Sequence, residues 1–232
     1  MNPVRWGAVA EIGVAAVLWA ALVAGSAVLA LTIPAYTSAL SRALAIPQSA
    51  GLPASDAIKL ADGVRALVAD REYDPLPATW AGAPAFDAGA VSHLLDVRRV
   101  ILAARLATGI AALLLAVYST LCIARRRLQR LSAGMTAGAV LTGLLLVLAL
   151  VAAVSDFSSF FAAFHGLFFT AGTWTFPADS LLIRLFPERV WMASGGAWAA
   201  LSGVGALALV AVGGFVRGAG ARLSASRMAN NV

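Results

Sequence analysis

Apolar residues dominate this chain in four long stretches that carry no charged side chain. The uncharged stretches cover residues 12–41, 106–124, 131–155 and 192–216. A helix needs about 20 apolar residues to cross the hydrocarbon core of a bilayer. The pattern therefore predicts transmembrane helices near residues 10–33, 101–124, 133–154 and 192–216. We expect an all-α, polytopic membrane protein in which residues 1–232 form a single integral membrane domain, with long outer loops at 34–98 and 155–190.

Composition supports this interpretation and excludes an ordinary water-soluble domain. Hydrophobic residues make up 61% of the chain and charged residues 12%, whereas soluble domains carry roughly 25% charged residues. The first apolar run is about twice as long as the apolar region of a signal peptide. It is followed by a poor cleavage site at 33–35, so we expect an uncleaved first helix. Cys122 is the only cysteine, which excludes an intrachain disulfide.

The charged residues predict the orientation in the membrane. Basic residues without acidic neighbours flank the spans on one side, namely Arg5, Arg125, Arg126, Arg127, Arg130, Arg217, Arg222 and Arg227. Ten of the 11 acidic residues fall on the other side: Asp56, Asp62, Asp70, Glu72, Asp74, Asp87, Asp96, Asp156, Asp179 and Glu188. Because cytoplasmic loops are enriched in Lys and Arg, both termini should be cytoplasmic and both long loops extracytoplasmic. The net charge of +6 then reflects topology, and no nucleic-acid partner is expected.

The first long loop should have structure of its own. Ser55 followed by apolar residues at helical spacing (Ile58, Leu60, Val64, Leu67 and Val68) predicts a capped amphipathic helix over 55–70. Trp80 and Phe86 are expected at the level of the lipid headgroups, where amphipathic aromatic side chains are favoured. The simplest interpretation of this loop is a cap over the helix bundle, which can also enclose a substrate.

The second long loop is the most aromatic part of the chain. Its aromatic residues are Phe157, Phe160, Phe161, Phe164, Phe168, Phe169, Trp174 and Phe176. Gly166, Gly172 and Pro177 interrupt it, so it should lie in the interface or re-enter the membrane. An interfacial aromatic belt would explain the composition alone. However, His165 stands near its centre, and an ionisable residue in such a setting indicates a functional site.

His93, the other of the two histidines, precedes the second predicted span. A helix that starts at Asp87 or Ser92 and runs into this span would place His93 and Asp96 on one face. Asp96 could then orient the imidazole, as the acid does in hydrolytic triads, or it could pair with a neighbouring arginine. Arg98 and Arg105 lie near the outer edge of the span and are expected to meet lipid headgroups.

The available side chains limit the chemistry. The sequence lacks a Gly-x-Ser-x-Gly elbow and a phosphate-binding glycine loop. Two histidines without further ligands make a poor zinc site, so no metal and no cofactor are expected. A b-type haem held by both histidines would require them within the spans rather than at their edges. Acid–base catalysis by imidazole remains, and it suits transfer of an acyl group from an ester to an amine, a downhill step that needs no ATP.

Two motifs resemble those of a known bacterial family. The segments are Ser92-His93-Leu94-Leu95-Asp96-Val97-Arg98 and Phe164-His165-Gly166-Leu167-Phe168-Phe169, followed by Trp174, Asp179, Leu182-Ile183 and Phe186-Pro187-Glu188. Together they resemble the lipoprotein intramolecular transacylase (Lit) family, and the resemblance covers essentially the whole chain. It implies four membrane helices with an outer cap between the first two.

The resemblance also implies a reaction: the sn-2 acyl chain of a diacylglyceryl lipoprotein moves onto the α-amine of its own N-terminal cysteine, which gives the lyso form. His93 and His165 would be catalytic, with His165 as the general base and His93 stabilising charge or relaying the proton. Asp96, Trp174 and Asp179 would support them. The expected partners are diacylglyceryl lipoproteins and membrane phospholipid in the bacterial cytoplasmic membrane. The alternative is a non-catalytic membrane scaffold that binds lipid or protein and needs neither histidine.

Overall fold

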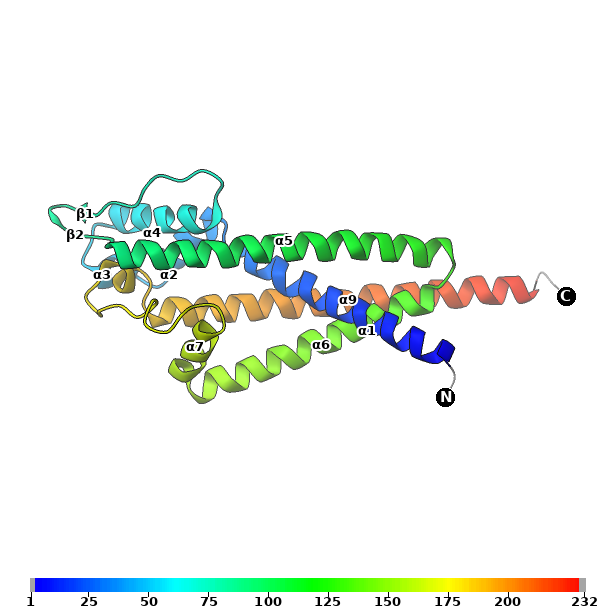
Figure 1. Cartoon of the computed structure of the whole chain (residues 1–232). Helices are drawn as coiled ribbons and strands as arrows, with labels where there is room; N and C mark the ends of the chain where they lie inside the picture. The colour runs from blue at the N-terminus through cyan, green and yellow to red at the C-terminus, as the bar shows by residue number, and fades with distance from the viewer. Residues whose placement is uncertain (1–2, 230–232) are drawn as a thin grey trace. The chain divides into compact units, whose positions relative to one another are not determined.

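The computed structural model describes residues 3–229, and long helices dominate it (Figure 1). Within this part of the chain, four helices are long and apolar enough to cross a membrane. They are α1 (Pro3–Ala30), α5 (Ala88–Ala124), α6 (Leu128–Ser155) and α9 (Glu188–Ala229). The prediction of an all-α membrane protein with four spans is therefore confirmed.

The second long helix begins earlier than the apolar pattern alone predicts. Helix α5 starts at Ala88 rather than near residue 101, because Asp87 caps it: its carboxylate accepts a hydrogen bond of 2.7 Å from the backbone N–H of Ala90. An aspartate in this position satisfies one of the free N–H groups of the first turn. The prediction that a helix from Asp87 runs into the second span is confirmed, and it places His93 on a continuous helix.

Shorter elements fill the two long connections. The first contains α2 (Pro34–Ala43), α3 (Ile46–Ala50), α4 (Ala54–Ala69), β1 (Thr79–Trp80) and β2 (Ala83–Pro84). The second contains α7 (Phe157–Gly166) and α8 (Leu181–Leu185). The two strands pair antiparallel, with Thr79 opposite Pro84. Their turn residues Ala81 and Gly82 both have positive φ, as a two-residue hairpin turn of this kind requires.

Contacts along the chain resolve two compact units. Unit 1 comprises residues 1–27, 106–150 and 199–232, and unit 2 comprises residues 28–105 and 151–198. Each long helix contributes residues to both units. A single domain over 1–232 stays a prediction.

Unit 1 packs its helices through small residues. A Cβ atom on Gly138 of α6 would lie 2.6 Å from Cβ of Trp19 on α1, so these two helices can approach closely only because the glycine has no side chain. A small buried cluster joins Cys122, Leu131, Met135, Ala139 and Leu209. Many large apolar side chains of the unit point outward instead, as expected for helices whose solvent is lipid.

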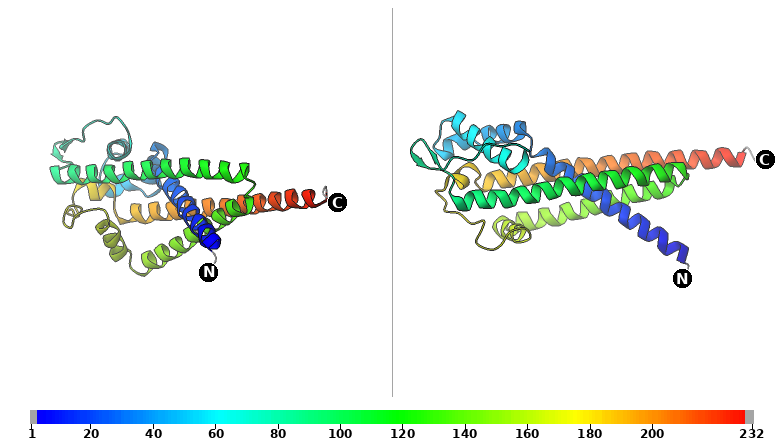
Figure 2. Two further views of the ribbon diagram at one scale, coloured as in Figure 1. Left: turned by 45° about the vertical axis from the view of Figure 1, so that its right-hand side comes forward. Right: turned by 45° about the horizontal axis from the view of Figure 1, so that its top comes forward.

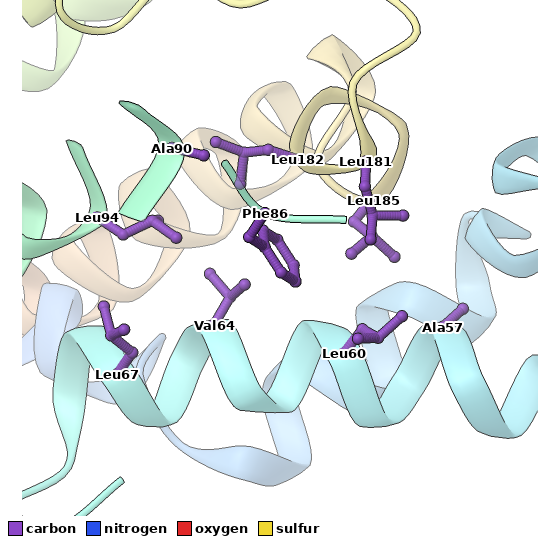
Figure 3. Packing of buried hydrophobic residues seen from close by; sticks show 10 residues of the cluster. All are labelled: Ala57, Leu60, Val64, Leu67, Phe86, Ala90, Leu94, Leu181, Leu182 and Leu185. Carbon is purple, nitrogen blue, oxygen red and sulfur yellow. The ribbon is translucent and has the colours of Figure 1, made fainter. Parts of the chain in front are cut away.

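Unit 2 has a hydrophobic core of its own, formed by α4, α8, the start of α5 and the residues just before it. The cluster contains Ala57, Leu60, Val64, Leu67, Phe86, Ala90, Leu94, Leu181, Leu182 and Leu185. Figure 3 shows the ring of Phe86 at its centre, facing Val64 of α4. Both views of Figure 2 show α2, α3 and α4 gathered beside the first turns of α5.

This core corrects one prediction about aromatic residues. Phe86 is 2% exposed and belongs to the core of unit 2, and Trp80 packs against the same core. The indole N–H of Trp80 donates to Asp56 at 3.1 Å. Phe86 is therefore a core residue rather than an anchor among the headgroups, because its whole ring is removed from solvent by this packing; the headgroup position of Trp80 stays a prediction. Sequence spacing alone does not reveal such a partner.

The amphipathic helix predicted over 55–70 is confirmed as α4, but its predicted cap is wrong. Pro53 occupies the N-cap position without a capping side chain. Ser55 lies inside the first turn, and its hydroxyl donates to the carboxylate of Asp56 at 3.2 Å. The fixed φ of proline and the acidic Asp56 near the positive end of the helix dipole favour a start one residue earlier.

Candidate active site

The first histidine lies in the second turn of α5. His93 is 8% exposed, so its ring is almost completely buried in unit 2. Its ring atom Nδ1 has no hydrogen-bond partner in the part of the chain that the structure describes. A buried polar atom without a partner is costly, by about 1–3 kcal/mol. Such an atom in a folded protein calls for an explanation, and a bound ligand is one.

The second histidine lies at the end of α7. Asp156 starts this helix, since its carboxylate accepts a hydrogen bond of 3.1 Å from the backbone N–H of Ser159. Nδ1 of His165 lies 2.9 Å from the carbonyl oxygen of Phe161, one turn earlier. A carbonyl only accepts, so Nδ1 carries the proton and donates it to this bond, and Nε2 of the neutral ring keeps a lone pair. Nε2 can therefore act as a base.

Burial of His165 favours the neutral ring. The residue is 8% exposed, and this desolvation lowers the pKa of the imidazole below its ordinary value, while the hydrogen bond to the carbonyl of Phe161 opposes that shift. Burial penalises the charged form of a histidine. The ring consequently stays neutral and basic at pH 7.

The fold brings the two histidines together. Their ring centroids lie 6.3 Å apart and the ring planes differ by 28°. Phe169 contacts both rings, with centroids 4.9 Å from His93 and 5.5 Å from His165. Phe176 adds a further contact to His93 at 5.7 Å. The two motifs, 72 positions apart along the chain, thus form one site with aromatic walls.

Trp174 completes the group of rings. Its ring centroid lies 4.9 Å from that of His165, with the planes tilted by 38°. Its indole nitrogen is buried and finds no hydrogen-bond partner among the described residues. Of the residues that the sequence suggested as supporting, Trp174 is the one in ring contact with a histidine.

The other two supporting candidates, Asp96 and Asp179, are acidic residues with different surroundings from Trp174. The carboxylate of Asp96 forms a salt bridge with Arg99, which is the pairing at the start of the helix that the sequence left open beside a contact to His93. Asp179 is exposed and stands next to Ser180, whose hydroxyl caps α8 by accepting from the N–H of Ile183. A supporting role for either carboxylate stays a prediction.

Arg98 and Arg105 hold the end of α4. Arg98 donates to the carbonyl oxygens of Leu67 and Asp70, each at 2.7 Å, and its guanidinium lies 4.7 Å from the ring centroid of Tyr73. Arg105 donates to the carbonyl of Ala69. These bonds satisfy carbonyls that the last turn of a helix leaves free. The sequence predicted lipid headgroups as partners of both arginines; that role stays a prediction beside this structural one.

An ion-pair network surrounds the buried guanidinium of Arg65 at the same end of α4, and the sequence alone did not predict it. Arg65, 8% exposed, donates to Asp62 at 2.6 Å and to both carboxylate oxygens of Asp70 at 2.8 and 2.9 Å. The hydrogen bond from Arg65 holds the pKa of Asp70 below its ordinary value. The spacing of Asp62 and Arg65, three residues apart on a helix, was the available signal.

These groups can carry out acid–base chemistry. In the described part of the chain, no group of three or more His, Cys, Asp or Glu side chains could hold a metal ion. The site offers a basic imidazole nitrogen on His165 and unpartnered polar atoms on His93 and Trp174, all within aromatic walls. This arrangement suits proton transfer to and from a bound substrate.

Comparison with known proteins gives a family and a fold. The family model of the lipoprotein intramolecular transacylase Lit matches residues 12–191. No curated protein matches the sequence.

Among solved structures, the chain is similar to the membrane integral lipoprotein intramolecular transacylase Lit from Bacillus cereus, with a TM-score of 0.80 and 14% identity over 97% of this chain and 99% of that one. Forms of that protein with one histidine replaced by arginine or by alanine give TM-scores of 0.75 and 0.76. They are 13% and 14% identical, over 97% and 98% of this chain and 96% and 100% of theirs. At such identities the likeness shows a shared fold.

Proposed function

Because the chain belongs to the lipoprotein intramolecular transacylase (Lit) family, we propose that it moves the sn-2 acyl chain of a diacylglyceryl lipoprotein onto the amine of the N-terminal cysteine of the same lipoprotein. The family identified from the two histidine motifs is thus confirmed. The chain is a multi-pass membrane protein and a membrane transacylase of lipoproteins. The specific transfer from ester to amine is the proposal.

The observation that carries this proposal is the pairing of the two histidines, whose ring centroids lie 6.3 Å apart. In this pair, Nδ1 of His165 donates to the carbonyl of Phe161, which leaves Nε2 free to act as a base. A general base must present an unprotonated atom to the proton that it removes. The hydrogen bond to Phe161 fixes the ring in this tautomer before the substrate arrives.

The reaction would proceed through a tetrahedral intermediate. Nε2 of His165 takes a proton from the cysteine amine as its nitrogen attacks the carbonyl carbon of the sn-2 ester. The new C–N bond forms first, and the intermediate then collapses with cleavage of the C–O bond to glycerol. The imidazolium of His165 returns the proton to the leaving glyceryl oxygen. Proton transfer by a positioned residue contributes about 10²–10⁴-fold, and holding ester and amine on one molecule adds effective molarity.

His93 would act on the charge that develops during this transfer. It contacts the aromatic walls that also contact His165, through Phe169, and its Nδ1 has no protein partner within the described residues. A ring nitrogen without a protein partner is available to the substrate, either to stabilise charge or to relay a proton.

Exposed apolar side chains beside His165 would receive the acyl chain. Phe164, Leu167 and Phe168 flank the histidine in sequence and are 47%, 77% and 49% exposed. Large apolar side chains left exposed next to a reactive group favour a lipid ligand. Membrane phospholipid would cover the same surface when no lipoprotein is bound.

The charge pattern supports an extracytoplasmic site. All ten acidic residues assigned to the outer side by the sequence belong to unit 2, together with both histidines. Basic residues near the spans mark the cytoplasmic side, and the basic cluster 125–130 belongs to unit 1; the side chains of Arg5 and Arg227 lie outside the described residues. Both termini would then be cytoplasmic, and residues 34–98 would form the outer cap.

Mass spectrometry of a reporter lipoprotein tests the proposal. The protein is co-expressed with the reporter in a bacterial host that lacks other N-acylation, and the N-terminal peptide is analysed. We expect an isobaric lyso form with the acyl group on nitrogen. His165→Ala should lower the rate by about 10²–10⁴-fold, and His93→Ala should also impair it severely.

Tyr36→Phe provides a matched control, since it removes another side-chain hydrogen bond of unit 2, the one between Tyr36 and Ser194 at 3.1 Å. This variant should remain active. An unchanged reporter peptide with correctly inserted wild-type protein would contradict the transfer and favour the non-catalytic scaffold. Full activity of both histidine variants would reject the roles given to the two rings.

A further inference from the structure

Trp174 differs from two other tryptophans of unit 2 in its hydrogen bonding. The indole N–H of Trp80 donates to Asp56 at 3.1 Å, and that of Trp191 donates to the carbonyl of Phe186 at 2.9 Å. The indole N–H of Trp174 is buried without a partner in the described structure. Leaving a buried donor unsatisfied costs about 1–3 kcal/mol, and buried tryptophans usually find an acceptor. The missing acceptor therefore indicates that a bound substrate could accept the hydrogen bond of Trp174.

A tight turn carries Trp174 back to the catalytic ring. The chain leaves α7 after Gly166 and turns at residues 170–173, where the N–H of Thr173 donates to the carbonyl of Thr170 at 3.2 Å. Gly172 in this turn has a φ of 85°, which glycine adopts far more readily than other residues. The ring centroid of Trp174 then lies 4.9 Å from that of His165, with the two planes tilted by 38°. The donor thus sits beside the group proposed to act as the base.

The chemistry of indole limits what Trp174 can bind. Its N–H is a donor with no acceptor capacity, so the cysteine amine cannot be its partner when it is protonated. The ester of the lipoprotein supplies a carbonyl oxygen, which accepts. During transfer this oxygen becomes an oxyanion, and fixed donors aimed at such an oxygen are among the largest contributions to acyl-transfer catalysis.

We propose that the indole N–H of Trp174 donates a hydrogen bond to the carbonyl oxygen of the sn-2 ester and stabilises the oxyanion of the tetrahedral intermediate. This role rests on the proposed function, and it assigns to Trp174 direct contact with the reacting group. No covalent bond to the indole forms or breaks. The hydrogen bond strengthens as the C–N bond forms and weakens again when the C–O bond to glycerol breaks.

The test removes the N–H and keeps an aromatic ring. Trp174→Phe should lower kcat for transacylation of a purified diacylglyceryl lipopeptide by about 10²–10³-fold, as removal of one oxyanion donor does elsewhere, with KM nearly unchanged. The pH profile of the remaining activity should keep its position, because the indole N–H does not titrate. Trp191→Phe is the matched control: the N–H of Trp191 donates to the backbone carbonyl of Phe186, so this variant should keep kcat close to that of the wild type.

A second replacement separates the N–H from the shape of the ring. Benzothienylalanine at position 174 has sulfur in place of the indole N–H and nearly the same outline, so it preserves the ring contact with His165. It should reproduce the loss of kcat. If Trp174→Phe fails to fold, the benzothienylalanine protein still tests whether the N–H of residue 174 is needed for catalysis.

The possible results are distinct. If the wild type is inactive on the lipopeptide, the proposed function fails and the role of Trp174 fails with it. If the wild type is active and the benzothienylalanine protein matches Trp191→Phe, the oxyanion role alone is wrong and Trp174 only packs against His165. A shift of the pH profile would point to a positioning role through His165 and would equally overturn direct donation to the ester.

Discussion

The two units of this chain use apolar residues in opposite ways. In unit 1, large apolar side chains face outward, as Leu207 and Phe215 do at 71% and 78% exposure, and the helices meet through small residues such as Gly138. In unit 2, one cluster of apolar side chains turns inward and surrounds Phe86, while exposed apolar side chains such as Leu167 lie beside His165. The first arrangement suits a lipid solvent, where burial of apolar side chains gives no hydrophobic gain. The second is the core of a domain that folds against water.

Polar side chains show the same difference. Unit 2 holds the ion pairs of Arg65 with Asp62 and Asp70 and both histidines. Unit 1 contains a single acidic residue, Glu11, which forms a salt bridge with Arg130. Burying a polar group costs free energy unless a hydrogen bond or an opposite charge compensates it. The candidate active site therefore belongs to the unit whose fold buries and orients the ionisable rings.

The largest expected effect comes from the centre of the inward-facing core. Phe86→Ala should lower the free energy of unfolding by about 3–5 kcal/mol, because it removes a buried ring and leaves a cavity. Phe215→Ala, the matched change at an exposed site of unit 1, should stay within about 0.5 kcal/mol. Unfolding in detergent micelles, followed by circular dichroism and by activity, measures both. Equal losses of unfolding free energy in the two variants would contradict the inference that Phe86 lies in a buried core while Phe215 faces lipid.

A smaller effect is expected from helix contacts in unit 1. In Gly138→Ala the new Cβ would lie 2.6 Å from Cβ of Trp19 and 3.1 Å from the carbonyl oxygen of Ala16. Such overpacking costs about 1–3 kcal/mol. Gly143→Ala in the same helix meets nothing within 4 Å and should be neutral or slightly stabilising. Thermal unfolding of both variants in the same detergent compares them, and a destabilised Gly143→Ala with an unaffected Gly138→Ala would refute close packing at Gly138.

The smallest effect concerns protonation in unit 2. Burial lowers the pKa of His165, so its imidazole should titrate below about 6.5, the ordinary value. The folded state favours the neutral ring; its contribution to stability is therefore present above about pH 6.5 and is lost as the pH falls towards the lowered pKa. The pKa of His165 can be measured directly by NMR of the ¹³C-labelled imidazole in the His93→Gln variant, in which His165 is the remaining histidine. A pKa above the ordinary value would contradict burial of the neutral form.

Several features of the site could be predicted from the sequence, and others could not. His93 and His165 stood out because histidine is rare in this chain and both motifs flank predicted spans. Trp174 was named only through the family resemblance, and the state of its N–H depends on which atoms surround it. The bonds of Arg98 and Arg105 to the end of α4 were missed because backbone carbonyls have no signature in the sequence.

By itself, the sequence determined what depends on neighbouring residues: the four spans, the amphipathic helix α4, the charge asymmetry and the two histidine motifs. These follow from the length of apolar runs and from helical periodicity, which are local properties. Only the tertiary structure decided that the rings of His93 and His165 meet, that Phe86 is a core residue and that Trp174 lacks an acceptor. Each of these depends on which segments, distant along the chain, pack against one another, because burial and hydrogen bonding are properties of those partners.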